Sequence, residues 1–183
     1  MAYNANNAVI FATGKSGRYG DGECWTLVED AVVGAGGKSS RVLTPNFSAT
    51  SSYVWGTVVQ PSGLQPGDVL QFSNYSWTRT VEVDVTNPDG SGSVNTTDAL
   101  ESRGSPQHSA LVVRVIGGGM VEVVEQNIPG GSGPVQTIQL LLVAGAPTVV
   151  TTRVMSAAGA TVTVTTTTDT VLNPPRCYRP QDA

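Results

Sequence analysis

Residues 21–31 read Asp21-Gly22-Glu23-Cys24-Trp25-Thr26-Leu27-Val28-Glu29-Asp30-Ala31, a glycine-containing turn followed by apolar residues at helical spacing. Trp25, Val28 and Val32 fall on one stripe of the predicted helix. Cys24 then lies in its first turn, among backbone N–H groups without an intrahelical partner and near the positive end of the helix dipole. Both features favour the thiolate, which is the nucleophilic form of cysteine. The stretch therefore predicts a helix that carries a reactive cysteine at its N-terminus.

The ends of this helix are marked by common capping residues. Asp21 or Gly22 can serve as the N-cap, and Gly34 supplies a C-terminal stop. Taken alone, Cys24 also fits a second interpretation, because free cysteines are often small buried hydrophobic residues. Whether Cys24 is a nucleophile or a core residue depends on whether the rest of the chain supplies a base that can lie beside it.

The composition indicates one β-rich domain over residues 1–183. A chain of 183 residues can bury a sufficient core without metal or disulfides, and its abundant glycine, threonine and valine favour strands and turns. The net charge of −4 and the scattered basic residues argue against nucleic acid as a partner. With one histidine, two cysteines and no Cys-x-x-Cys pair, neither a metal site nor another cofactor is expected. Cys24 and Cys177 are expected to have separate roles rather than to form a disulfide.

The sequence also bears on where the protein is made. No run of residues approaches the roughly 18 apolar residues of a membrane span. Residues 1–7 lack the basic region and the apolar core of a secretory signal. We therefore expect synthesis in the cytoplasm without a signal peptide. Delivery to the cell wall or periplasm would then depend on lysis or on a secretion or phage machine.

The middle of the chain is predicted to alternate between strands and loops. Residues 69–72 form a core strand after the turn Pro66-Gly67-Asp68. Asp68 is interpreted as a turn-capping residue rather than as a catalytic acid. Alternating side chains predict a half-buried strand over residues 77–85. The polar residues 86–106 are predicted to form a long loop.

The two ends of the chain differ in character. Gly14-Lys15-Ser16 matches only the end of a phosphate-binding loop, and no strand and helix flank it directly, so no nucleotide site is predicted. The segment before Cys24 is interpreted as a flexible lead-in. Residues 136–180 are predicted to be a β-rich extension, with strands over 136–143, 148–155 and 161–172.

A predicted hairpin carries the only histidine of the chain. Residues 108–116 and 120–127 are expected to pair antiparallel about Gly117-Gly118-Gly119. Counting outward from the middle glycine places His108 opposite about residue 128. The start of the first strand thus lies beside the polar end of the second.

That polar end offers His108 two partners. Glu125 and Asn127 are close to it in this pairing and point to the same face. An imidazole beside a carboxylate and an amide is the arrangement of base and orienting group that activates a nucleophile. We expect His108 to act on Cys24, with Glu125 as the orienting group and Asn127 in support, because a carboxylate also stabilises the imidazolium.

Four motifs of the chain resemble the CHAP group of the NlpC/P60-like cysteine peptidases and amidases. Members of that group carry a Gly-x-Cys helix start, a Gly-Asp-Val strand, a His-x-Ala-Val strand and a closing Glu-Gln-Asn. The matching motifs are Gly22-Glu23-Cys24-Trp25-Thr26, Leu64-Gln65-Pro66-Gly67-Asp68-Val69-Leu70-Gln71-Phe72, His108-Ser109-Ala110-Leu111-Val112 and Glu125-Gln126-Asn127. The resemblance covers residues 20–128, and its specific part is the order of the cysteine, the histidine and the Glu-Gln-Asn motif.

The resemblance implies a papain-like α+β fold, in which the cysteine-bearing helix packs on an antiparallel sheet. It implies Cys24 as nucleophile, His108 as base and Glu125 or Asn127 as orienting group. The implied reaction is hydrolysis of amide bonds, usually in peptidoglycan peptides, without a cofactor. The backbone N–H of Cys24 is a natural oxyanion donor, and the second donor is left open between Tyr19 and the backbone of residues 20–23.

Two alternatives stay open at this point. The same fold and site can cleave or transfer acyl groups on a protein substrate, which suits an acidic chain without a signal peptide. The domain can instead be an inactive structural or binding module of a phage or secretion apparatus, with its glycine- and threonine-rich strands as an assembly surface. The sequence gives no indication of the oligomeric state.

Overall fold

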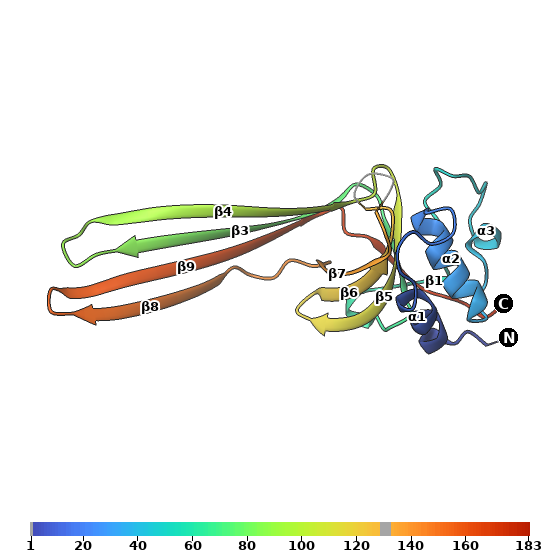
Figure 1. The fold of residues 1–183 in the computed structure, drawn as a ribbon, viewed down its shortest axis with the longest axis horizontal. Coiled ribbons are helices and arrows are strands. Elements are labelled where there is room, and N and C mark those ends of the chain that lie inside the picture. The colour runs from blue at the N-terminus through green and yellow to red at the C-terminus, as the bar shows by residue number, and fades with distance from the viewer. Residues whose placement is uncertain (1, 129–132) are drawn as a thin grey trace.

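The structure, a computed structural model, describes residues 2–128 and 133–183. Short helices near the N-terminus pack on antiparallel sheets, and the C-terminal region is rich in strands (Figure 1), so the protein is α+β. The helices are α1 (Ala5–Thr13), α2 (Cys24–Gly34), α3 (Ser40–Leu43) and the 3₁₀ helix η1 (Pro61–Gly63). The strands are β1 (Thr57–Val59), β2 (Val69–Phe72), β3 (Tyr75–Thr86), β4 (Gly92–Arg103), β5 (His108–Gly117), β6 (Met120–Glu125), β7 (Gln136–Leu141), β8 (Thr148–Ser156), β9 (Gly159–Leu172) and β10 (Arg176–Arg179).

A central sheet of six strands holds the core. Its order is β1-β10-β2-β5-β6-β7, and all neighbouring strands are antiparallel. Helices α1 and α2 lie on one face of it (Figure 1). The apolar side of α2 is fully buried there, with Leu27 and Val28 in one cluster with Leu111 and Val124 of the sheet. This packing fixes the helix that begins at Cys24 relative to the strand that begins at His108.

The predicted strand over residues 69–72 is confirmed as β2, and all four of its side chains are buried. Its neighbour β5 pairs with it so that Phe72 lies opposite His108. Because β2 and β6 flank β5 on its two sides, the histidine strand is central in the sheet, as its apolar sequence predicts.

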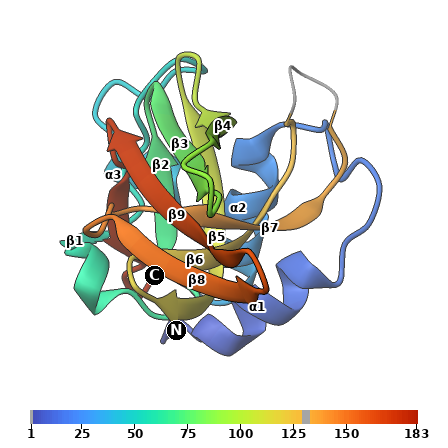
Figure 2. The ribbon, with the colours of Figure 1, turned by 90° about the vertical axis from the view of Figure 1, so that its left-hand side faces the viewer.

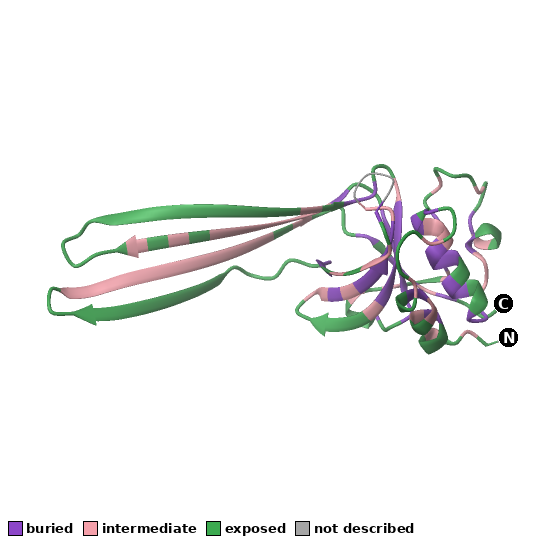
Figure 3. Ribbon diagram, viewed as in Figure 1, coloured by how far each residue is buried: buried purple, intermediate pink, exposed green. Residues whose placement is uncertain are grey.

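Four strands form a second antiparallel sheet, in the order β4-β3-β9-β8. This sheet projects from the rest of the protein as a long single layer (Figure 1), which we call the arm, residues 75–103 and 148–172. Figure 2 shows the arm from its tip, with β4 and β8 at its two edges. Strand β8 is exposed along its whole length, and the inner strand β9 is half-buried over most of its length (Figure 3).

The arm is built from two hairpins that are separated in the sequence. The β3–β4 hairpin lies between β2 and β5, which are neighbours in the central sheet. The β8–β9 hairpin lies between β7 and β10. The two are joined by the pairing of β3 with β9, where Arg79 and Trp77 of β3 both contact the Asp169 carboxylate of β9 at 2.8–2.9 Å.

The prediction of a long loop over residues 86–106 is wrong. Most of that stretch is β4, and the turn of the hairpin takes only residues 87–91. The strand went unrecognised because alternation of apolar and polar residues arises where one face of a sheet is covered. Residues 92–100 of β4 are all exposed, so this signal is missing.

Several further elements were not predicted, namely α1, α3, β1, η1 and β10. The N-terminal segment contains α1, a helix capped by the Asn4 side chain, which accepts a hydrogen bond from the Asn7 N–H. The end of the chain contains β10, which lies between β1 and β2 in the central sheet and so belongs to the core. Within residues 2–128 and 133–183, no helix has the length and apolar character needed to cross a membrane.

Candidate active site

The hairpin of β5 and β6 brings His108 and Glu125 together. Near its open end Leu111 lies opposite Val124. Two register shifts lie closer to the turn. They offset the pairing at the open end by one residue from the prediction, in which His108 lies opposite residue 128. As a result, the face of β5 that carries His108 is the face of β6 that carries Glu125. The His108 Nε2 atom lies 2.9 Å from Glu125 Oε2.

Cys24 is the first residue of α2 and follows a tight turn over residues 19–23. Gly22 has a φ of 88°, a left-handed conformation that a side chain would strain. Asp21 stabilises the turn, because its Oδ1 accepts a hydrogen bond from the Glu23 N–H at 3.0 Å. The N-cap of the helix is Glu23, without a side-chain capping bond, and not Asp21 or Gly22 as predicted. The N-terminus of α2 is thus left open toward the cleft.

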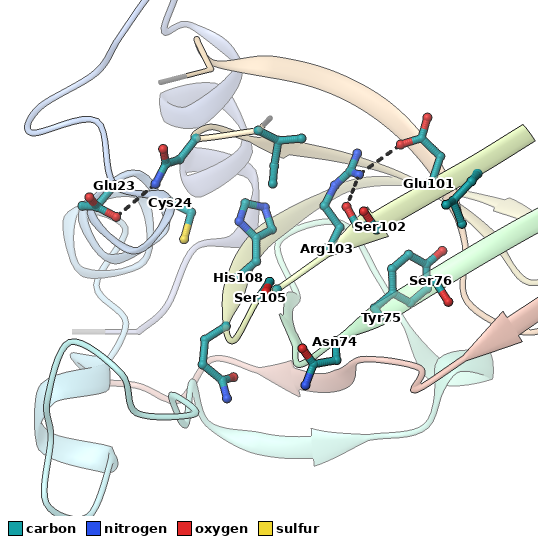
Figure 4. Close-up of a pocket in the computed structure, with 15 residues that line it drawn as sticks. Glu23, Cys24, Asn74, Tyr75, Ser76, Glu101, Ser102, Arg103, Ser105 and His108 are labelled. Atoms are coloured by element: carbon teal, nitrogen blue, oxygen red, sulfur yellow. Dashed lines mark hydrogen bonds and ion pairs between the residues drawn. The ribbon is translucent and has the colours of Figure 1, made fainter. Parts of the chain in front are cut away.

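The thiol of Cys24 lies against the imidazole of His108 (Figure 4). Because Nε2 of the ring is bonded to Glu125, Nδ1 is the nitrogen available to the thiol. The exposed fractions of Cys24 and His108 are only 8% and 3%. The Phe72 ring also packs near the imidazole, with 5.9 Å between ring centroids. Little water reaches these groups, so their mutual interactions are weakly screened.

Three side chains donate hydrogen bonds to the fully buried Glu125 carboxylate. His108 is one of them. Arg103, the last residue of β4, places Nε at 3.0 Å from Oε1 and at 2.9 Å from Oε2. Gln136, the register partner of Glu125 on β7, donates its Nε2 to Oε1 at 2.9 Å. The carboxylate is therefore held as an ion and in a fixed orientation.

The sequence alone missed both Arg103 and Gln136. Arg103 falls in the stretch that was predicted to be a loop, and the pairing of β7 with β6 is not visible in the sequence. The one signal in the sequence that pointed to such partners was Glu125 itself, since a buried carboxylate needs partners that neutralise its charge.

The electrostatics of the site favour a protonated imidazole. Burial lowers the pKa of His108, but hydrogen bonds and charge from Cys24 and Glu125 outweigh it and raise the pKa to about 9. Burial raises the pKa of Glu125, but its bonds to His108 and Arg103 hold that pKa below its usual range. An imidazolium beside an ionised carboxylate is the state that stabilises a neighbouring thiolate.

The structure brings Asn127 to Glu23 rather than to His108. Strand β6 ends at Glu125, and Asn127 has a φ of 73°, so the two-residue period of the strand no longer sets its direction. Its Nδ2 donates a hydrogen bond to Glu23 Oε2 at 3.1 Å. Asn127 thus fastens the strand end to the residue before the cysteine.

Gln126 holds the same turn from the buried side. Its Oε1 accepts a hydrogen bond from the Tyr19 N–H at 3.1 Å, and its Nε2 donates to the carbonyls of Tyr19 and Glu23 at 3.2 and 2.6 Å. The side chain is fully buried. One amide therefore joins both ends of the turn that precedes Cys24. The sequence placed Gln126 on the face away from His108 but gave it no role.

The Cys24 N–H is free to serve as an oxyanion donor. No described residue accepts a hydrogen bond from it, as expected for the first turn of a helix. Three of the other predicted candidates, Tyr19, Gly22 and Glu23, are engaged elsewhere. Tyr19 donates its N–H and its hydroxyl to other side chains, and the N–H groups of Gly22 and Glu23 are bonded within the turn.

A cleft of about 800 Å³ opens in front of the cysteine and the histidine. One wall is the turn before α2, and the opposite wall is the root of the arm, from Tyr75 on β3 and Glu101 on β4 (Figure 4). The walls carry the carboxylates of Glu23 and Glu101. Among the described residues that line the cleft, the only cationic side chain besides His108 is Arg103, which is bonded to Glu101 at 3.0 Å and to Glu125. The cleft is therefore negatively charged.

Two other residues have structural roles. Asp68 caps its turn, as predicted, by accepting a hydrogen bond from the Gln65 N–H at 2.8 Å, and it also pairs with Arg179. Cys177 is buried on β10 and, like Cys24, is not in a disulfide, which confirms the prediction that the two cysteines do not pair. Burial raises the pKa of the Cys177 thiol to about 11.

In the part of the chain that the structure describes, no group of three or more His, Cys, Asp or Glu side chains is arranged to hold a metal ion. The chain matches no protein-family model, no curated protein and no solved structure. The case for a function rests on the site itself.

Proposed function

We propose that this protein is a cysteine-dependent amide hydrolase, with Cys24 as nucleophile, His108 as base and acid, and Glu125 as orienting group. The observation that carries this proposal is the series of contacts from the thiol through the imidazole to the buried carboxylate, with 2.9 Å between His108 Nε2 and Glu125 Oε2. The second cysteine has no such partner, because Cys177 donates only to the Pro175 carbonyl, at 3.7 Å.

The reaction begins from an ion pair, in which the proton of the Cys24 thiol has already passed to His108 Nδ1. The thiolate attacks the carbonyl carbon of the substrate amide, and the Cys24 N–H stabilises the negative oxygen of the tetrahedral intermediate. The intermediate expels the amine, which takes the proton from His108, and a thioester on Cys24 remains. Water then gives a proton to His108 and attacks the thioester, which releases the carboxylic acid and restores the thiol.

We further propose that the fold is papain-like and of the CHAP type. The order of the elements supports this, since the cysteine begins a helix, the histidine begins a central strand and Glu125 ends the next strand. The Gly-Asp-Val segment lies in and before β2, beside the histidine strand. None of the four motifs that carry the resemblance lies in the arm.

For the substrate we propose a peptide with a free amino group near the cleaved bond, as in a peptidoglycan stem peptide. The support is the charge of the cleft. The carboxylates of Glu23 and Glu101 lie on its walls, and the guanidinium of Arg103 is neutralised by two carboxylates. An ammonium group in this cleft is attracted, whereas a carboxylate there is repelled.

The test uses purified protein with defined peptidoglycan fragments, with the products identified by mass spectrometry. We expect cleavage by the wild type and by Cys177→Ser, and none by Cys24→Ser, which is nearly isosteric but has no thiolate. Matched peptides with free and acetylated amino groups test the substrate class, and the free amines should react faster. Turnover by a folded Cys24→Ser protein would refute the assignment of Cys24 as the nucleophile.

A thiol-directed electrophile tests the site independently of any substrate. At pH 7 to 8 we expect alkylation of Cys24 and not of Cys177, because burial raises the pKa of the Cys177 thiol to about 11. His108→Ala should slow the alkylation of Cys24 strongly. Equal rates in the wild type and in His108→Ala would mean that the imidazole does not activate the thiol.

A further inference from the structure

The arm has two free strand edges of unusual length for an isolated chain. Strand β4 has 12 residues and β8 has 9, and neither has a neighbour on its outer side. Free edges present unpaired backbone N–H and C=O groups to other chains. Monomeric proteins protect such edges with lysines, prolines, bulges or short strands. Neither edge strand contains a lysine or a proline, and their pairing with β3 and β9 runs without a register shift.

The sequence of β8 favours pairing with another strand. It reads Thr148-Val149-Val150-Thr151-Thr152-Arg153-Val154-Met155-Ser156, and six of its nine residues are β-branched. All nine are exposed, with Val154 and Met155 at 62% and 70%. A single-layer sheet that leaves such residues in water on both faces gains little from burial.

The directions of the two edges are complementary. Strands β3 and β8 run from the root of the arm to its tip, and β4 and β9 run back. When two copies of the arm stand side by side and point the same way, β8 of one is antiparallel to β4 of the next. The alternation of strand directions then continues across the contact without a break.

The charges of the two halves are also complementary. In the β3–β4 hairpin, Glu82, Asp84, Asp89 and Asp98 lie toward the tip and have no cationic partner among the described residues. In the β8–β9 hairpin, Arg153 is the only cation, and it also has no partner among the described residues, while Asp169 is paired with Arg79. Strand pairing places Asp98 and Arg153 on the same face of the arm. When two arms stand at the same height, Arg153 lies level with Gly92 at the tip end of β4, next to the turn that carries Asp89, whereas Asp98 lies six residues nearer the root. Pairing of β8 with β4 therefore brings Arg153 to the acidic tip of the next copy.

We propose that the partner of the arm is a second copy of this chain, bound through pairing of β8 with β4 of the next copy. Such a contact uses two different surfaces of the same protein, so successive copies add in one direction. They form a ring when the rotation between copies closes, and a ring leaves no edge unpaired. Four strands from each copy then form a closed antiparallel barrel without free edges. The cysteine sites lie at the roots of the arms, at one end of this barrel.

The test measures the mass of the full-length protein in solution, by light scattering after size exclusion, over a range of concentrations and at low and high salt. We expect oligomers that dissociate on dilution and at high salt. Arg153→Ala should weaken each contact about two- to fivefold, the range for an exposed charge pair. Arg114→Ala is the matched control, since Arg114 is equally an exposed arginine but lies on β5, away from the arm. It should leave the association unchanged.

Exchanging the charges of two residues distinguishes pairing of β8 with β4 from pairing of either edge strand with itself. Asp89→Arg should weaken association, and adding Arg153→Asp to it should restore part of the loss. Hydrogen exchange should show protection of β4 and β8 amides at high concentration, with circular dichroism as the check that each variant is folded. A wild type that stays monomeric at all concentrations overturns the proposal. Stronger association of Arg153→Ala also overturns it, because relief of repulsion would mean that β8 pairs with β8.

Discussion

The guanidinium of Arg103 and the carboxylate of Glu125 form a buried ion pair between the last residue of β4 and the last residue of β6, with Arg103 Nη2 2.9 Å from Oε1. The exposed fractions of the two side chains are 2% and 0%. Glu125 in turn holds His108. The arm and the cysteine site are therefore joined through one carboxylate, and the root of the arm orients the imidazole.

Replacing Arg103 by lysine should reduce activity through this carboxylate. Lysine keeps the charge but cannot make the two parallel bonds of a guanidinium. We expect kcat to fall about tenfold with a smaller change in KM, and unfolding in urea to show a loss of about 1–3 kcal/mol. The matched control is Arg79→Lys, which alters an equally bidentate pair with Asp169 at the root of the arm but does not touch Glu125. An equal loss of kcat in both variants would mean that the effect comes from the arm as a whole.

Glu125→Gln should change the pH profile as well as the rate. The carboxylate raises the pKa of His108, so its loss should lower that pKa from about 9. The alkaline limb of kcat/KM reports loss of the imidazolium, and we expect it to move to lower pH in the variant. At neutral pH the rate should fall by one or more orders of magnitude. Glu122→Gln, on the same strand but paired with the exposed Arg114, is the control and should keep the wild-type profile.

The stability of the fold should depend on pH through His108. Its pKa is raised from 6.5 to about 9 in the folded protein, so the folded state binds the proton more tightly than the unfolded state. The added stability is complete below about pH 6.5 and is lost as the pH rises through about 9, at roughly 1.4 kcal/mol per pKa unit. Urea unfolding at pH 6 and pH 9.5 measures the difference, on the order of 3 kcal/mol. A Cys24→Ser protein should show a smaller difference, since the thiolate contributes to the shift.

Gln126→Ala should release the turn before the cysteine. The variant leaves the Tyr19 N–H and the carbonyls of Tyr19 and Glu23 without their partner, at a cost of about 1–3 kcal/mol in unfolding free energy. Alkylation of Cys24 should slow because the thiol is no longer held against His108. Asn127→Ala removes a single bond at the rim and should cost less in both measurements. If Asn127→Ala proves the more damaging, the turn before Cys24 is held mainly by the bond from Asn127 to Glu23 and not by Gln126.

The sequence predicted the parts of the fold that bury an apolar face. The helix at Cys24 and the strands at Val69 and His108 are read correctly because their side chains pack in the core. The cysteine, the histidine and Glu125 could be paired because the hairpin turn is marked by three glycines. The register was wrong by one residue, since the two shifts in β5 leave no mark in the sequence.

Three strands of the arm, β3, β8 and β9, match predicted strands, but β4 and its contact with the site could not be predicted. Strand β4 has both faces exposed over residues 92–100, so its composition resembles that of a loop. Once β4 is read as a loop, Arg103 is no longer at a strand end, and its bond to Glu125 has no basis in the sequence. Asn127 was misplaced for a local reason, because its positive φ ends the strand two residues earlier than the alternation suggests.

The length of the arm is set by the number of residues in its paired strands. Its two hairpins are separate insertions in the sequence, and their strands pair without register shifts. Removing or adding two residues in each strand keeps every side chain on its face and changes the length by about 7 Å. The central sheet is unaffected, since β2 and β5 pair with each other whatever lies between them. The distance between the cleft and the tip of the arm can therefore be changed in steps of about 7 Å without altering the cysteine site.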